Sequence, residues 1–384
     1  MLDLFAIEEL LSPEERMVRD TVRAFVDAEV MPCIVEHYRA GTFPKHLIAR
    51  FGELGLLGAN VKGYGMPGLS STAYGLILAE LERADSGIRS FCSVQTSLVM
   101  GTILLFGSDA QKSDWIPRLG RGEAIGCFGL TEADAGSNPG AMRTTAKRTK
   151  SGWLLNGSKR WITNGTLAEV AIVWAKTDDG VRGFLVTSNT PGFTARVMHG
   201  KLSMRASDTA ELFFEDCALP EGALLPASLG LKSALMALTQ ARFGIAWGAI
   251  GAAIGSFECA RDYAVTRVQF AGRPIASHQI IQQHFAEMAT EITKAQLVAW
   301  RLAELKDAGK MTPVQVSLAK RNNVRMALDV SRRAREILGA NGVCDDYPPM
   351  RHAANLESVY TYEGTHDIHT LVLGKALTGI DAFA

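Results

Sequence analysis

The densest concentration of chemically active side chains lies in residues 360–369, which read Tyr-Thr-Tyr-Glu-Gly-Thr-His-Asp-Ile-His. Glu363 precedes Gly364, and a glycine at such a place lets the backbone approach a ligand closely. Glu363, His366 and His369 could supply three metal ligands, but no surrounding pattern supports a metal site. We therefore interpret Glu363 as a general base before a tight turn, and we expect no bound metal.

A second charged group consists of Glu82, Asp85 and Arg89, which lie three and then four positions apart in a predicted helix. Residues at this spacing share one helix face. The pattern fits an arginine held by acids and presented to an anionic ligand, because a guanidinium binds a carboxylate through paired hydrogen bonds. It also fits a solvated face of surface salt bridges, and the pattern by itself favours that structural role.

Two further segments could contact a flat, polar ligand. Residues 127–140 follow a β-like start and become small and polar, so their N–H groups could bind an anion or a heteroaromatic edge, or could form a plain surface loop. Residues 161–164 place a tryptophan beside a threonine, which suits stacking on a cofactor and equally suits a strand end. Residues 63–68 match Gly-x-Gly-x-x-Gly, but helical sequence precedes them and Pro67 interrupts the turn, so we interpret them as an irregular loop.

The elements that must position these residues divide the chain into three predicted parts. Residues 1–124 read as helices, with starts at Ser12-Pro13 and near Ser71 and another helix through residues 46–54. Residues 125–226 contain short β-rich runs separated by turn signals, typical of a small barrel or sandwich. Residues 227–384 return to long helices. One of these begins at Thr312-Pro313 and is predicted to stop at residues 340–342.

Small residues recur on the first of these long helices, where Gly244, Gly248 and Ala252 lie four apart, as do Gly251 and Gly255. Such a stripe allows another helix to approach closely. It does not by itself say which helix, or whether that helix belongs to the same chain.

Composition excludes several classes of protein. The 384 residues carry 40 Lys and Arg against 40 Asp and Glu, with no basic run, which argues against a nucleic-acid partner. Six cysteines without a Cys-x-x-Cys pair are typical of buried thiols in a reducing compartment. The acidic N-terminus does not resemble a secretory signal, and residues 244–257 are too short and too rich in glycine to span a bilayer. We expect a cytoplasmic protein with no integral membrane segment.

Several motifs together resemble the acyl-CoA dehydrogenases, a family of FAD flavoproteins. The resemblance covers nearly the whole chain in the family's order, and each motif is weak alone. The matching segments are residues 129–132, 161–163, 241–242, 267–270, 279, 337–342 and 362–365.

Within this family the sequence is most similar to the glutaryl-CoA dehydrogenases, through residues 88–90, 93–100, 242–248, 320–323 and 361–369. Arg89 is the distinguishing residue, because relatives that take simple fatty acyl chains need no cation in the acyl pocket. The resemblance therefore favours the functional interpretation of Arg89.

The resemblance implies an α+β multidomain fold: an N-terminal helical domain, a central β-barrel-like domain and a C-terminal four-helix bundle. It also implies a homotetramer and FAD as cofactor. The implied FAD contacts are Phe128, Leu130, Thr131, Gly136, Ser137, Trp161, Ile162 and Thr163 at the flavin ring; Arg267, Phe270 and Gln279 at the pyrophosphate and adenine side; Glu336, Leu338, Gly339 and Ala340 from a neighbouring subunit; and Thr365 and Asp367.

The implied substrate contacts serve two ends of an acyl-CoA. Arg89 and Ser90 would bind a distal carboxylate, with Glu82 and Ser93 tuning that end. The remaining contacts, near the CoA portion or the base, are Ser137, Arg242, Tyr362 and Gly364.

The activity that the resemblance implies is FAD-dependent α,β-dehydrogenation of glutaryl-CoA with decarboxylation to crotonyl-CoA and CO2. Glu363 would remove the α-proton, and the electrons would pass to an electron-transfer flavoprotein. Alternatives remain open: the reaction could stop at glutaconyl-CoA, or use another dicarboxylic acyl thioester or a carrier-protein thioester. An oxidase that uses O2 is another alternative, and an intact Glu363 argues against a non-catalytic binding protein.

Two positions depart from the family pattern. One extra residue lies between Phe270 and Pro274, and we expect it to shift the pyrophosphate contacts or to be absorbed as a bulge. Asn138 stands where relatives commonly have Asp, and we expect a local change in hydrogen bonding without loss of flavin.

Overall fold

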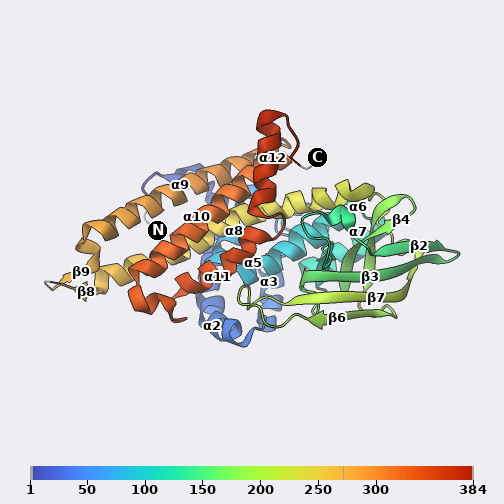
Figure 1. Ribbon diagram of the computed structural model, residues 1–384, viewed down its shortest axis with the longest axis horizontal. Helices are drawn as coiled ribbons and strands as arrows, with labels where there is room; N and C mark the ends of the chain where they lie inside the picture. Colours follow the sequence, from blue (N-terminus) through green and yellow to red (C-terminus); the bar gives the residue numbers. More distant parts are fainter. Residues whose placement is uncertain (1–2, 271, 383–384) are drawn as a thin grey trace.

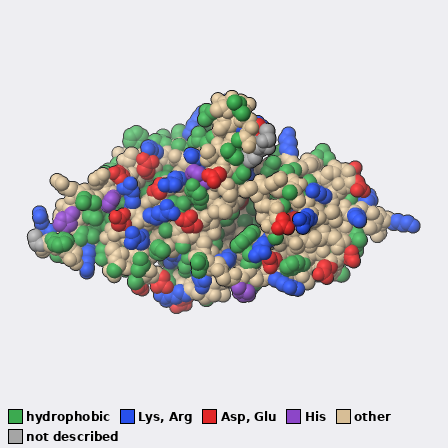
Figure 2. Space-filling view, in the orientation of Figure 1, with side chains coloured by type: hydrophobic (Ala, Val, Ile, Leu, Met, Phe, Trp, Pro, Cys, Tyr) green, Lys and Arg blue, Asp and Glu red, His purple; other side chains and the backbone are tan. Residues whose placement is uncertain are grey.

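The computed structural model describes residues 3–270 and 272–382. Helices occupy one end of the elongated molecule and the β-sheet the other, and helix α8 runs between them (Figure 1). Acidic and basic side chains are interspersed over the face seen in Figure 2, in keeping with the zero net charge. The predicted sequence of helical, β and helical parts is confirmed.

The N-terminal part is helical, and its first helix begins where the sequence predicts. Ser12 Oγ accepts from the Glu15 N–H while the Glu15 carboxylate accepts from the Ser12 N–H, which satisfies two backbone donors at the helix start. Residues 63–68 form an irregular loop, as predicted. The helices are α1 (Pro13–Phe25), α2 (Met31–Ala40), α3 (Ile48–Glu53), α4 (Ser71–Ala84), α5 (Ser86–Ser93), α6 (Gly101–Phe106) and α7 (Asp109–Gly120).

The prediction that Glu82, Asp85 and Arg89 share one helix is wrong. Asp85 has an extended backbone (φ −165°, ψ 140°), so α4 ends at Ala84 and α5 starts at Ser86. Asp85 Oδ1 accepts from the Gly87 N–H at 2.7 Å and so caps α5. The chain turns a corner at Asp85, and this corner brings Arg89 back towards Glu82.

The central part is a seven-stranded sheet in the order β1-β4-β2-β3-β7-β6, with β5 paired to β4. The β-rich runs in the sequence are confirmed as β3, β4, β5 and β7, whereas the short strands β2 and β6 had no comparable signal. The strands are β1 (Gly126–Gly129), β2 (Thr145–Thr149), β3 (Gly152–Thr163), β4 (Val170–Thr177), β5 (Gly180–Thr187), β6 (Phe193–Val197) and β7 (Thr209–Pro220).

The C-terminal part is built from long helices and one small hairpin. The start of α10 after Thr312 is confirmed, but the helix ends at Ile337, before the predicted stop, and a 3-10 turn over Gly339–Val343 follows. The elements are α8 (Gly230–Thr266), α9 (Gln279–Asp307), α10 (Pro313–Ile337), α11 (Pro348–Thr361) and α12 (His366–Thr378), with β8 (Val268–Gln269) and β9 (Arg273–Pro274) at the tip between α8 and α9.

The small-residue stripe of α8 lies against α4 of the same chain. A Cβ on Gly251 would stand 1.8 Å from the Ala79 carbonyl oxygen, so the two helices touch through backbone. Two segments, Ser86–Phe106 and Gly230–Thr266, are long and apolar enough to span a membrane. Residues 244–257, predicted to be too short by themselves, lie inside the second of these segments. Most of both apolar windows is buried inside the protein, 83% and 78% respectively.

Gly248→Ala is expected to lower the thermal unfolding midpoint by several degrees. Its Cβ would stand 2.1 Å from Glu82 Oε2 and 2.8 Å from Arg89 Nε, so a buried ion pair would have to move. Overpacking of this kind costs about 1–3 kcal/mol. Gly374→Ala on α12 is the matched control, because no atom lies within 4 Å of its Cβ, and alanine is the better helix former. Equal midpoints for the two variants would contradict the argument; calorimetry on both proteins measures them.

Candidate active site

Glu363 lies in the turn between α11 and α12, in a backbone conformation that non-glycine residues rarely adopt. Its φ is +52°, and Gly364 follows at +92°. Such a conformation persists only where the surrounding structure holds it. Glu363 Oε2 is buried and has no hydrogen-bond partner among the described residues. A buried, unpartnered carboxylate oxygen on a strained turn is the arrangement expected of a general base.

Burial raises the pKa of Glu363, and three nearby cations oppose that shift. These cations are Arg242, Arg89 and Lys320. Arg242 also donates through Nε to the Glu363 carbonyl oxygen at 2.6 Å. The carboxyl group is therefore moved towards a working pH for proton transfer while cations keep the ionised form accessible.

Arg89 is fully buried and lies next to the Glu363 turn. Its Nε donates to Glu82 Oε2 at 2.5 Å, and Nη2 donates to the Tyr362 hydroxyl. The third nitrogen, Nη1, bonds to no described residue. Glu82 is itself held by the Ser86 hydroxyl at 2.8 Å. The structure thus confirms that an acid holds Arg89, and the acid is Glu82.

Asp85 does not take part in holding Arg89. Its Oδ2 instead lies 3.2 Å from Arg351 Nε and accepts from Asn355 Nδ2 at 2.9 Å. The interpretation of three residues on one face was wrong because α4 ends before Asp85.

Two serines on α5 lie beside this arginine in the sequence. Both Ser90 and Ser93 are buried, and Ser93 Oγ has no partner among the described residues. A Cβ on Gly244 of α8 would stand 3.3 Å from Ser93 Oγ, so α8 covers this hydroxyl closely. The unpartnered hydroxyl is available to a polar group of a ligand.

The predicted flavin-ring residues lie on the β-sheet and in the loop after β1. The register of β3 shifts between Lys159 and Ile162, and this bulge gives Trp161 a φ of +64° with 56% of its surface exposed. An exposed tryptophan on a strained bulge presents its ring to a ligand. Of the other predicted residues, Phe128, Leu130 and Ile162 are buried, Thr131 and Thr163 are half-buried, and Gly136 and Ser137 are exposed.

Glu132 anchors the loop that carries Thr131 and Ser137. Its carboxylate accepts from the N–H groups of Arg143 and Thr144 and from the Lys159 ammonium at 2.8 Å. These hydrogen bonds outweigh burial and lower the pKa of Glu132 to about 2. The glutamate of the Gly-Leu-Thr-Glu motif is therefore structural, and it fixes its neighbours for binding.

A second group of predicted FAD residues lies at the far end of the molecule. Arg267, Phe270 and Gln279 belong to the β8–β9 hairpin and the start of α9 (Figure 1), and all three are exposed. Asn341 Nδ2 donates to the Tyr263 hydroxyl at 3.0 Å, which places the turn after α10 at the same end. Along α8, Arg242 and Thr266 are separated by about 36 Å. One chain therefore does not bring this group to Glu363.

The other predicted FAD contacts at this far end of the molecule belong to the β8–β9 hairpin, to the end of α10 and to the turn after it. Leu338 is buried, and Phe270 is 82% exposed with a φ of +51°. Ala271, at the position of the extra residue, lies outside the described residues, and the hairpin pairs normally on either side of it. Glu336, Gly339 and Ala340 are exposed.

The start of α12 carries the last two predicted FAD contacts. Thr365 Oγ1 accepts from the Ile368 N–H at 3.1 Å and caps the helix. Asp367 is exposed in the first turn. Both lie within four positions of Glu363 in the sequence, on the same side of the molecule as the candidate base.

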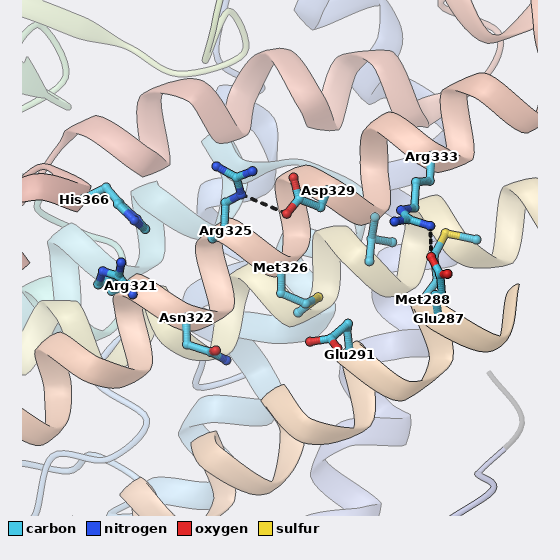
Figure 3. Close-up of a pocket in the computed structure, with 11 residues that line it drawn as sticks. Glu287, Met288, Glu291, Arg321, Asn322, Arg325, Met326, Asp329, Arg333 and His366 are labelled. Atoms are coloured by element: carbon cyan, nitrogen blue, oxygen red, sulfur yellow. Dashed lines mark hydrogen bonds and ion pairs between the residues drawn. The ribbon is translucent and has the colours of Figure 1, made fainter. Parts of the chain in front are cut away.

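A cavity of about 560 Å³ lies between α9 and α10. Figure 3 shows its walls, formed by charged side chains of α9 and α10 and by His366, with ion pairs between Arg325 and Asp329 and between Arg333 and Glu287. None of the predicted catalytic, substrate or cofactor residues lines it. His366 stacks on Tyr360 here, whereas His369 is buried with Nδ1 3.0 Å from Ser317 Oγ and with Nε2 beside Gly364.

Comparison with known proteins gives consistent matches along the whole chain. Models of the N-terminal, middle and C-terminal domains of acyl-CoA dehydrogenases match residues 12–123, 127–217 and 229–378. A solved glutaryl-CoA dehydrogenase from Mycobacterium smegmatis in complex with FADH2 is 51% identical with a TM-score of 0.98, covering 100% of this chain and 99% of that one.

Two further relatives are more distant. A chain in a structure described as the electron transferring flavoprotein of Acidaminococcus fermentans is 34% identical with a TM-score of 0.93, over 96% of this chain and 98% of that one. The mitochondrial short-chain specific acyl-CoA dehydrogenase of Mus musculus is 39% identical over 374 residues, 96% of this chain and 90% of the relative.

Proposed function

We propose that this chain, which belongs to the acyl-CoA dehydrogenase family, oxidises glutaryl-CoA at its α and β carbons and then releases CO2 to give crotonyl-CoA. The observation that carries the choice of substrate is the buried guanidinium of Arg89 beside the Glu363 turn. The similarity to a glutaryl-CoA dehydrogenase at 51% identity supports the same choice.

The family's cofactor is FAD, and the residues of this chain fit it. An exposed Trp161 on its bulge, the exposed backbone at Gly136 and Ser137, and the unpartnered Glu363 Oε2 provide a stacking surface, hydrogen-bond donors and a base. Thr131 and Thr163 would hydrogen-bond the ring. When bound, the flavin accepts a hydride equivalent from the β-carbon of the thioester.

Glu363 supplies the proton chemistry of the proposed reaction. Its Oε2 takes the proton from the α-carbon, and the electron pair of that C–H bond moves towards the thioester carbonyl. The Glu363 N–H forms no hydrogen bond with any described residue, so it is free to donate to the developing oxyanion. One such donor is worth about 3–4 kcal/mol in other enzymes.

The charges around the site favour a substrate with a second carboxylate. The cations Arg89, Arg242 and Lys320 face the carboxylates Glu82 and Glu363. Arg89 uses Nε for Glu82 and Nη2 for Tyr362, so Nη1 is left to donate to a substrate carboxylate. A fatty acyl chain would offer that buried donor no acceptor.

The proposed decarboxylation uses the same residues. Oxidation at the α and β carbons gives an enoyl thioester whose γ-carbon carries the carboxylate. When the bond to CO2 breaks, its electron pair spreads onto the thioester, and protonated Glu363 returns its proton to the γ-carbon. Arg89, already shared with Glu82, can bind the carboxylate and still release it as CO2.

The electrons leave through an electron-transfer flavoprotein, and the protein acts as a homotetramer. In one chain the β8–β9 hairpin lies far from β3 (Figure 1). This separation supports assembly, because a second copy is needed to bring both sets of predicted FAD contacts together.

The test is anaerobic mixing of the FAD-loaded protein with glutaryl-CoA, followed by mass analysis of the thioester. Flavin bleaching with crotonyl-CoA and CO2 is the expected result. Bleaching with glutaconyl-CoA would show dehydrogenation without decarboxylation. No bleaching by glutaryl-CoA, with bleaching by butyryl-CoA, would overturn the choice of substrate.

A further inference from the structure

The turn that carries Glu363 has three successive carbonyl groups, and each accepts a hydrogen bond from a buried cation. Lys320 Nζ lies 3.1 Å from the Tyr362 carbonyl oxygen and 2.8 Å from the Gly364 carbonyl oxygen. Arg242 Nε lies 2.6 Å from the Glu363 carbonyl oxygen. The carbonyl side of the turn is thus fixed from α8 and α10, which leaves the Glu363 N–H without a partner among the described residues.

Lys320 is well placed to act as a rigid support. It is 1% exposed, and its side-chain hydrogen bonds to described residues all go to this turn. Asn323, three residues further along α10, donates to the carbonyl oxygens of Ala246 on α8 and Ala295 on α9. This part of α10 is therefore tied to both neighbouring helices, so the Lys320 ammonium is held in place beside the Glu363 turn.

We propose that Lys320 is a positioning residue for proton abstraction: by binding the carbonyls on either side of Glu363 it holds the left-handed turn and aims the Glu363 N–H and carboxylate at the thioester. The inference rests on the proposed function, because it assigns Glu363 the part of base. Without the ammonium, two carbonyls would lose their donors and the turn would relax towards ordinary backbone angles.

The Lys320 charge also acts on the Glu363 carboxyl group. The groups that act on that carboxyl are Arg242 from α8, Arg89 from α5, Lys320 from α10 and the neighbouring Tyr362. His369 from α12 lies against the Glu363 backbone. Burial lowers the pKa of Lys320 to about 7, and the nearby Glu363 carboxylate opposes that shift. His369, whose pKa burial lowers to about 3, is neutral at working pH. Removing the ammonium therefore raises the pKa of Glu363.

The experiment compares Lys320→Met with wild type and with Lys320→Arg, all loaded with FAD. For Lys320→Met we expect unchanged flavin content, a kcat lowered about 10- to 100-fold with KM within about threefold, and an acid limb of the kcat–pH profile moved up by about one pH unit. Lys320→Arg, which keeps a cationic donor, should recover most of kcat and the wild-type pH limb. Lys294→Met on the exposed face of α9 is the matched control.

The wild type is first mixed with glutaryl-CoA and, separately, with butyryl-CoA, and the variants are then measured with the thioester that reduces the wild-type flavin. An error in the proposed substrate appears in the wild type, whereas an error in the role of Lys320 appears only in the variants. A Lys320→Met protein within twofold of wild-type kcat with an unmoved pH limb would overturn the inference. If Lys320→Met does not fold, Lys320→Gln is measured instead. This variant keeps a neutral hydrogen-bond donor but removes the charge, so the inference requires that it still shifts the acid limb of the kcat–pH profile.

Discussion

Glu363→Gln is expected to bind FAD normally and to reduce the rate of flavin bleaching by glutaryl-CoA about 10³- to 10⁴-fold. The amide is nearly the same size as the carboxyl group and occupies the same strained turn, but it cannot accept the α-proton. General-base catalysis contributes up to about 10⁴-fold, so this loss should be near the upper end. Anaerobic stopped-flow measurement of flavin absorbance gives the rate directly.

The pH dependence of the wild type gives an independent check on the same group. Burial raises the pKa of Glu363 above the ordinary value of 4.5. The rate of flavin bleaching should therefore increase as the pH rises through that raised pKa, because a protonated Glu363 cannot accept the α-proton. Glu357→Gln is the matched control, since the carboxylate of this exposed glutamate on α11 forms its ion pair with Arg332 at the surface. Glu363→Gln retaining a rate within tenfold of wild type would show that another group takes the proton.

The double variant Glu82→Gln, Arg89→Met is expected to change its substrate preference from glutaryl-CoA to butyryl-CoA. Its kcat/KM for glutaryl-CoA should fall about 10²- to 10³-fold, because the distal carboxylate would then enter an apolar pocket without a counter-ion. For butyryl-CoA, kcat/KM should stay within about threefold of wild type or rise, since its short chain needs no cation. Steady-state kinetics with both thioesters measures the ratio.

Both residues are changed because Arg89 and Glu82 neutralise each other inside the protein. Arg89→Met alone would leave Glu82 buried without its cation, and we expect that variant to unfold at a lower temperature than the double variant. Arg301→Met with Glu304→Gln removes an exposed pair on α9 and serves as the control. A double variant that still prefers glutaryl-CoA would mean that Arg89 does not bind the substrate carboxylate.

Local sequence patterns were sufficient for much of this protein. Hydrophobic periodicity and capping residues determine the helical, β and helical parts and the starts of α1 and α10, because these depend on neighbours within a few residues. Residues 360–369 identify Glu363 as the candidate base for a similar reason, because the polar and charged side chains that indicate it are contiguous in the sequence. Family resemblance added FAD, which neither periodicity nor composition indicates.

Other features depend on residues that are far apart in the chain. Lys320 and Tyr362 of the Glu363 turn are hydrogen-bonded although they are 42 residues apart in the sequence, and Arg89 and Tyr362 are hydrogen-bonded although they are 273 residues apart. No local sequence pattern predicts such pairs. The corner at Asp85 was missed because helical spacing continues through it, whereas Arg351 and Asn355 stabilise the break from another domain. The small residues of α8 predicted a close approach, but only packing identified α4 as the neighbour.

The sequence by itself therefore determined the order of the helical and β parts and identified Glu363 as the candidate base. Only the tertiary structure decided which cations surround that candidate base, that Arg89 is buried against Glu82, and that the β8–β9 hairpin lies far from the β-sheet in one chain (Figure 1). The physical reason is that burial and charge pairing arise when distant segments pack together, whereas helix and strand formation depend on residues close in sequence.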